Sequence, residues 1–206
     1  MDVQVRHDFL GTLSGIRSVN ITSVVHDDLL ALIEAQDAKR TRSWNASAAA
    51  RAGRRPPEDD PFFDEYREGD ELERWMELLA AQHPETVSYI PTIGPSIEGR
   101  NIPALAIGGE VGGPAIYMQA GLHAREWISH ATLLYIASAL VNSEDPRIQR
   151  LVRDVRFYLV PNTNPDGYEW TWTGPINRML RKNRRQFCTA NTPPTPCKLI
   201  DLLPSR

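Results

Sequence analysis

The chain has 206 residues, of which 41% are hydrophobic and 24% are charged, and its formal net charge at pH 7 is −3. This length suits one domain or two small ones, and this composition is that of a packed rather than a disordered chain. The charge favours neither nucleic acid nor an anionic membrane as the main partner, and apolar stretches such as 131–141 are too short to span a bilayer.

The first part of the chain divides into a small folded unit and a linker. A β-branched stretch at 18–25 predicts a strand, and Asp27 and Asp28 open a helix whose apolar side begins at Leu29. Residues 38–60 are rich first in Arg, Ala and Ser and then in Pro and acidic residues, which indicates an exposed linker.

A helix and a hairpin are predicted after the linker. Asp70, with Glu73 three residues later, forms a variant of the capping box that starts a helix. Short strands at 87–93 and 101–107 flank a turn that contains Gly and Pro, which predicts a β-hairpin. The apolar side of the helix consists of four residues at helical spacing: Leu72, Trp75, Met76 and Leu79.

The next elements are two strands with a helix between them. The strands are predicted at 115–120 and 155–160, and the apolar segment 128–142 predicts a buried helix. A strand, a helix and a further strand indicate a right-handed crossover between parallel strands. We therefore predict an α/β fold, in which a mixed sheet carries helices on both faces.

Candidate metal ligands follow the first of these two strands. His123 and Glu126 come directly after 115–120, and the Asn164–Gly167 loop follows 155–160, so both loops are expected at the same rim of the sheet. Catalytic zinc is typically held by two nitrogens and one carboxylate, with water in the fourth position. The pair supplies two of these three ligands, and we predict Zn²⁺ as the cofactor. The alternative is an exposed His and Glu on the first turn of a helix.

Two groups of basic residues extend this interpretation. Arg125, between the candidate ligands, is placed to contact a substrate carbonyl or carboxylate, unless it is simply solvated. Residues 178–185 contain five cations, but no broader basic or aromatic surface accompanies them, which disfavours nucleic acid. A guanidinium beside a zinc-bound carbonyl would stabilise a developing oxyanion, which gives one of these arginines a role.

Four motifs of the chain are also those of a known family. They are Ile93-Gly94 to Glu98-Gly99-Arg100, Gly121 to Ile128, Pro161 to Tyr168, and Asn177 to Arg184. With these motifs in this order, the chain resembles the zinc carboxypeptidases of the pancreatic carboxypeptidase A/B type, including their fungal relatives.

The resemblance implies a division of the chain and roles for four residues. Residues 1–37 would be the C-terminal part of an activation segment, and 38–60 the linker in which activating cleavage occurs. Residues 61–187 would be the N-terminal part of a carboxypeptidase domain, and 188–206 an atypical tail. By the same resemblance, His123 and Glu126 are the first two zinc ligands, Arg125 contacts substrate, and Arg181 polarises the scissile carbonyl as a catalytic residue. Cys188 would be one half of a disulfide.

The resemblance ends at about Cys188, before several of the family's functional residues. A second histidine ligand, a carboxylate-binding Asn-Arg pair, a tyrosine and a glutamate base are expected after this point, and the sequence does not supply them. His130 lies within the apolar helix, so we expect it to pack rather than to bind metal. We therefore expect an incomplete and inactive chain, without a signal peptide and with the apolar flank of its last strand exposed.

The parent protein implied by the resemblance is a metallocarboxypeptidase that releases C-terminal amino acids from peptides. It would be a zymogen, secreted or vacuolar, monomeric, and without nucleic acid or membrane partners. The alternative is a non-catalytic, carboxypeptidase-like protein that binds peptides and is linked to the fungal cell wall. A third hypothesis is that the chain is an interaction fragment or does not fold.

Overall fold

A computed structural model describes residues 28–39 and 56–185, which fall in two compact units, one within 1–41 and one within 42–206. In the first unit, helix α2 (Leu29–Lys39) follows Asp28, whose carboxylate accepts a hydrogen bond from the Ala31 N–H at 3.0 Å. The helix predicted after the two aspartates is therefore confirmed. The strand predicted at 18–25, most of the linker and the tail lie outside the described residues.

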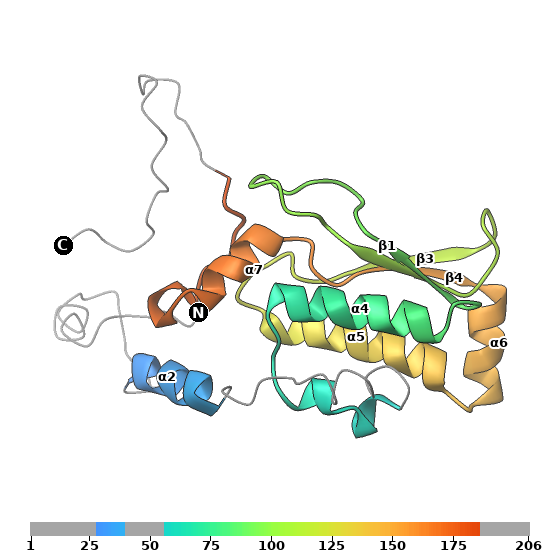
Figure 1. The fold of residues 1–206 in the computed structure, drawn as a ribbon, viewed down its shortest axis with the longest axis horizontal. Coiled ribbons are helices and arrows are strands. Elements are labelled where there is room, and N and C mark those ends of the chain that lie inside the picture. Colours follow the sequence, from blue (N-terminus) through green and yellow to red (C-terminus); the bar gives the residue numbers. More distant parts are fainter. Residues whose placement is uncertain (1–27, 40–55, 186–206) are drawn as a thin grey trace, which may run out of the picture. The chain divides into compact units, whose positions relative to one another are not determined.

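The second unit contains a mixed four-stranded sheet (Figure 1). Strand β1 pairs antiparallel with β2, β2 antiparallel with β4, and β4 parallel with β3, so the spatial order is β1-β2-β4-β3. The predicted hairpin and parallel crossover are both confirmed. The strands are β1 (Val87–Ile90), β2 (Ala104–Ile107), β3 (Ala115–Gln119) and β4 (Arg156–Val160).

The hairpin strands are shorter than predicted, and a proline explains both the end of β1 and the start of β2. Pro91 follows the last residue of β1 and Pro103 precedes the first residue of β2. Neither proline has a backbone N–H to donate to a ladder. Between them the chain forms a loop with a single isolated bridge, Pro95 to Asn101.

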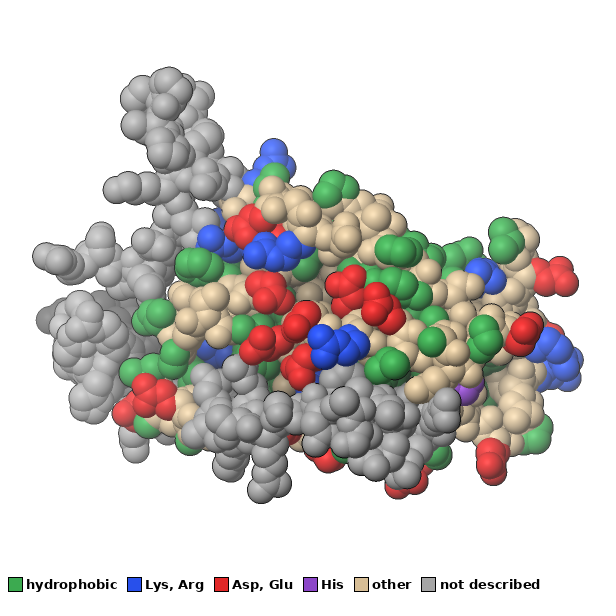
Figure 2. All heavy atoms as spheres, in the orientation of Figure 1, with side chains coloured by type: hydrophobic (Ala, Val, Ile, Leu, Met, Phe, Trp, Pro, Cys, Tyr) green, Lys and Arg blue, Asp and Glu red, His purple; other side chains and the backbone are tan. Residues whose placement is uncertain are grey.

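Four α-helices of residues 56–185 accompany the sheet, and the first begins differently from the prediction. They are α4 (Gly69–Gln82), α5 (Trp127–Asn142), α6 (Pro146–Asp154) and α7 (Pro165–Trp172). At the start of α4 the Glu71 carboxylate accepts a hydrogen bond from the Glu68 N–H at 3.1 Å, so the predicted cap formed by Asp70 and Glu73 is wrong. Asp70 lies instead in the first helical turn, where its charge complements the helix dipole, and acidic side chains gather over this part of the surface (Figure 2).

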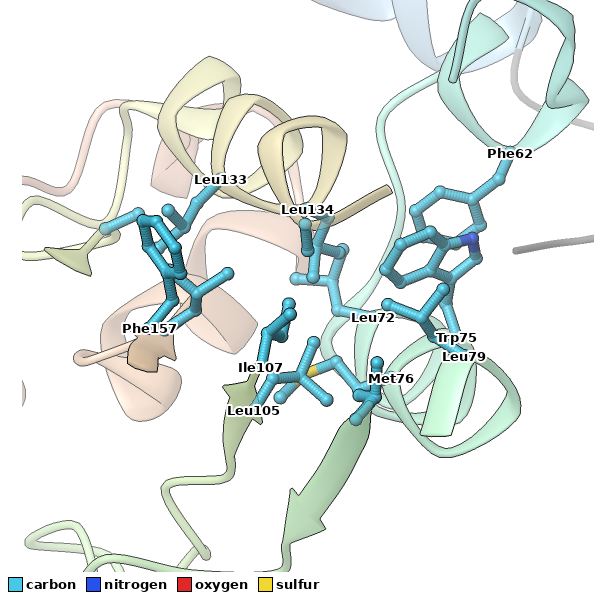
Figure 3. Packing of buried hydrophobic residues seen from close by; sticks show 14 of the residues in the cluster. Phe62, Leu72, Trp75, Met76, Leu79, Leu105, Ile107, Leu133, Leu134 and Phe157 are labelled. Carbon is cyan, nitrogen blue, oxygen red and sulfur yellow. The ribbon is translucent and has the colours of Figure 1, made fainter. Parts of the chain in front are cut away.

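The hydrophobic core lies between one face of the sheet and the helices (Figure 3). Strand register places Leu105, Ile107 and Phe157 on this face, against the predicted apolar side of α4 and against α5. On the opposite face, Tyr117 is 58% exposed. The mixed α/β sheet with helices is thus confirmed, while a helical layer on the second face stays a prediction. None of the described helices is long and apolar enough to cross a membrane.

Candidate metal centre

The ends of β3 and β4 are joined by hydrogen bonds at one rim of the sheet. Ala120, directly after β3, donates its N–H to the Val160 carbonyl at 3.0 Å. The Ala120 carbonyl accepts from both the N–H and the hydroxyl of Thr163, at 3.0 and 2.8 Å. The two loops that follow these strands therefore start side by side, as the sequence predicts.

His123 and Glu126 lie together in the first of these loops, which we call the metal loop (residues 121–126). His123 Nδ1 and Glu126 Oε1 are 2.8 Å apart, and the side chains are 26% and 49% exposed. An imidazole nitrogen and a carboxylate oxygen at this spacing are two donors of the kind that zinc binds, and both are accessible to an ion from solvent. The pair thus fits two positions of a zinc site. Within residues 28–39 and 56–185, no group of three or more His, Cys, Asp or Glu could hold a metal ion.

Gly121 gives the metal loop its sharp turn away from β3. Its φ of +74° is in the left-handed region, and a Cβ here would lie 2.5 Å from His130 Nε2. The Gly121 N–H is bound by the Ser129 hydroxyl at 3.2 Å, and this hydroxyl donates to the Glu126 carbonyl at 2.7 Å. Ser129 therefore ties together both ends of the loop.

Asn164 holds the metal loop from the neighbouring loop. Its Nδ2 donates to the Leu122 carbonyl at 3.2 Å, while its Oδ1 accepts from the Gly167 N–H at 3.1 Å and so caps α7. The side chain is buried, with both ends of its amide bonded. One residue thus couples the start of α7 to the carbonyl before His123.

Residues 175–185 hold the loop from a third side. The Ala124 N–H donates to the Arg181 carbonyl at 2.9 Å. Arg178 Nη1 donates to the Arg125 carbonyl at 2.8 Å, and its guanidinium carbon lies 3.7 Å from the centre of the Trp127 ring. The backbones of Arg125 and Arg181 are therefore fixed beside the candidate ligands, while both side chains are exposed to solvent.

His130 faces the core behind the metal loop. It is fully buried, and its ring stacks on Tyr168 with centroids 4.0 Å apart. Burial lowers its pKa to about 4, which makes the ring neutral at pH 7. This position agrees with the predicted packing role.

A network of charged groups connects the 92–101 loop to α7 and to 178–185. The buried Asp166 carboxylate accepts hydrogen bonds from the Ser96 hydroxyl at 2.7 Å, the Glu98 N–H at 3.1 Å and Arg100 Nη1 at 2.8 Å. Glu98 in turn binds Arg184 at 2.8 Å. Burial raises the pKa of Asp166, but the hydrogen bonds from Ser96 and Arg100 outweigh it and hold this pKa below its ordinary value.

Sequence comparison identifies the family that has this arrangement. A family model described as zinc carboxypeptidase matches residues 72–202. The chain belongs to the zinc carboxypeptidase family. The matched range continues past Cys188, where the resemblance was expected to end, into residues outside the described ranges. The predicted cofactor, Zn²⁺, is the metal of this family.

Individual zinc carboxypeptidases align with parts of the chain. Zinc carboxypeptidase A 1 of Anopheles gambiae is 36% identical over 128 residues, which are 62% of this chain and 29% of that protein. Inactive metallocarboxypeptidase ecm14 of Talaromyces marneffei is 39% identical over 142 residues, or 63% of this chain and 23% of that protein. The crystal structure of carboxypeptidase A from Helicoverpa armigera has a TM-score of 0.62 and 28% identity, and the match covers 82% of this chain and 39% of that one.

These comparisons confirm the resemblance to carboxypeptidases of the pancreatic type and to their fungal relatives. The chain spans less than a third of the length of either aligned relative. The roles assigned to His123, Glu126, Arg125 and Arg181 stay predictions, although the structure places all four in or against one loop. The role of Arg178 could not be predicted from the sequence, because its contact with Arg125 joins residues 53 positions apart and no local spacing signals it.

Proposed function

We propose that the protein is a zinc-dependent carboxypeptidase that releases C-terminal amino acids from peptides. The observation that carries this proposal is the His123–Glu126 pair, 2.8 Å apart and exposed at the strand rim, in a chain of the zinc carboxypeptidase family. We propose that these two side chains are zinc ligands. The catalytic proposal requires a third ligand and a general base from outside the described residues.

The residues around the pair suit such a reaction. Bound zinc would polarise the scissile carbonyl and lower the pKa of a coordinated water. The exposed Arg181 guanidinium, held next to the loop by its own backbone, is proposed to stabilise the charge that develops on the carbonyl oxygen. Arg125 is proposed to contact the peptide.

Several further features of the whole protein belong to this proposal. We propose that it is a secreted or vacuolar zymogen and a monomer, with 1–37 as part of an activation segment and 38–60 as the site of activating cleavage. Two possible glycosylation sequons, at Asn20 and Asn45, support secretion. Both sequons lie outside the described residues.

A second candidate is a non-catalytic protein that binds peptides and contributes to the fungal cell wall. The observation in its favour is that a relative with 39% identity is named an inactive metallocarboxypeptidase. A backbone-anchored loop next to two exposed arginines suits peptide binding as well as hydrolysis. The two candidates differ in whether a glutamate base accompanies the zinc site.

The test begins with the transcript across the codons for 186–206, so that the longest natural product is known and expressed. Release of free amino acids from a set of peptides is then measured, with and without a zinc chelator. We expect chelator-sensitive release in the activated protein, and its loss in both His123→Ala and Glu126→Ala. Retained release in both variants would contradict the zinc-ligand assignment, and peptide binding without release would favour the second candidate.

A further inference from the structure

Two arginines of the 178–185 segment make the same stacking contact but differ in their second partner. The guanidinium carbon of Arg178 lies 3.7 Å from the Trp127 ring centre, and that of Arg184 lies 3.7 Å from the Trp170 ring centre. Arg178 Nη1 then donates to the Arg125 carbonyl of the metal loop at 2.8 Å. Arg184 Nε instead binds the Glu98 carboxylate at 2.8 Å, outside that loop.

Arg178 therefore contacts both sequence neighbours of Glu126. The Arg125 carbonyl belongs to the peptide group before Glu126, and the Trp127 ring belongs to the residue after it. A guanidinium that fixes one peptide group and the next side chain restricts the backbone torsions between them. The torsions of Glu126, φ −87° and ψ 61°, are those that direct its carboxylate toward His123.

The Trp127 ring is a firm support for this contact. The Trp127 ring also stacks on Trp172, with centroids 3.6 Å apart and planes inclined by 14°. Arg178 and Trp172 are both too close to the ring centre to share one face, so they lie on opposite faces of Trp127. Its Nε1–H donates to the Thr171 hydroxyl at 2.8 Å, and both residues are buried. The guanidinium and the two indoles thus form one stack that runs from the metal loop to α7, and the Thr171 hydroxyl holds the edge of the Trp127 ring.

We propose that Arg178 is a positioning residue for the zinc site. It sets the orientation of Glu126 through the Arg125 carbonyl and the Trp127 ring. This inference rests on the proposed zinc site. Lysine cannot replace arginine here. A guanidinium is planar and carries several N–H donors, so it can stack on the indole and donate to the carbonyl at the same time, whereas an ammonium cannot do both.

The test is zinc binding by the longest natural product that the transcript encodes, because the third ligand is proposed to lie outside the described residues. Zn²⁺ alone is the probe. The dissociation constant is measured from the ring signals of His123 in a histidine-labelled sample. Contacts that orient a ligand typically change metal affinity by 10–100-fold, so we expect Arg178→Lys to weaken zinc binding about tenfold. Arg184→Lys is the matched control, because it loses the same stacking contact in the same segment, and we expect unchanged affinity.

Each outcome separates the positioning role from the zinc site. Equal affinity in Arg178→Lys and Arg184→Lys would overturn the positioning role and leave the zinc site standing. No response of His123 to Zn²⁺ in the unsubstituted chain would overturn the zinc site, and the positioning role with it.

A measurement on the unsubstituted chain tests the proposal even if the Arg178→Lys variant does not fold. Because coupling between two sites is reciprocal, zinc should shift the Nε–H signal of Arg178 and leave that of Arg184 in place. Shifts of both signals, or of neither, would contradict the proposal.

Discussion

Asn164 shows how one side chain can join two parts of a site that are distant in sequence. Its amide oxygen caps α7 and its amide nitrogen holds the carbonyl of Leu122, 42 residues earlier. An aspartate has the same shape and keeps the capping oxygen, but it has no hydrogen to donate. The two functions of the side chain can therefore be separated by exchanging a single group.

We expect Asn164→Asp to lower the free energy of unfolding by about 1–3 kcal/mol, because the Leu122 carbonyl loses its donor and faces a carboxylate. Urea denaturation at pH 7 measures this change. Asn177→Asp is the matched control. The Asn177 amide donates to the Thr173 hydroxyl at an exposed position, so the loss of this hydrogen bond should lower the free energy of unfolding much less. Equal losses in the two variants would show that the contact with Leu122 does not stabilise the loop.

At the scale of elements, a network of charged groups helps to fix the loop between β1 and β2, in addition to backbone hydrogen bonds such as that from the Ile93 N–H to the Ile102 carbonyl at 2.8 Å. Asp166, in the first turn of α7, accepts hydrogen bonds from Ser96, Glu98 and Arg100. Its pKa in the folded chain is below the ordinary value of 3.8, since the hydrogen bonds outweigh the effect of burial. The stability that this carboxylate contributes is therefore present above pH 4 and is lost as the pH falls through the lowered pKa.

Asp166→Asn should remove this dependence on pH. We expect the variant to be less stable at pH 7 and to lose less of its remaining stability between pH 5 and 3 than the unsubstituted chain does. Unfolding by urea at several pH values gives both quantities. Asp154→Asn serves as the control, because Asp154 pairs with Arg153 at an exposed position and should change the profile little. Parallel profiles for Asp166→Asn and the unsubstituted chain would contradict the prediction.

The elements that follow from local patterns were predictable, and those that depend on distant contacts were not. Two short strands around a turn with Gly and Pro located the hairpin, and the strand–helix–strand order gave the parallel pair β3 and β4. The cap of α4 was misplaced because acidic residues at 68, 70, 71 and 73 offer two capping pairs at the same spacing, and only the fold selects one. No local sequence pattern predicts the contacts of Asn164 and Arg178 with the metal loop, because their partners lie 42 and 53 positions away.

At the scale of the molecule, β3 is an edge strand among the described elements. It pairs with β4 on one side, and Ile116 and Tyr117 on it are 42% and 58% exposed. The strand Ala115–Gln119 contains neither charge nor proline, the features that usually prevent edge-to-edge pairing. The sequence placed an exposed apolar flank on the last strand, 155–160, but β4 pairs with both β2 and β3, so the exposed edge lies on β3 instead.

The 206-residue chain should therefore self-associate through β3, and Tyr117→Lys should weaken this association by placing a charge on the edge. Sedimentation velocity over a range of protein concentrations measures the effect. Val111→Lys introduces the same charge at an 83% exposed residue of a turn and should leave association unchanged. If the two variants behave alike, net charge rather than the strand edge controls association.

The metal loop is held mainly through its main chain, by Ser129, Asn164, Arg178 and the carbonyl of Arg181. A main chain is common to all residue types, so, apart from Gly121 with its positive φ, the shape of the loop depends little on which side chains it presents. Natural selection can therefore discard the chemistry of this loop while the fold persists. This independence is compatible with a family in which one relative is named a carboxypeptidase and another, of similar identity to this chain, is named inactive.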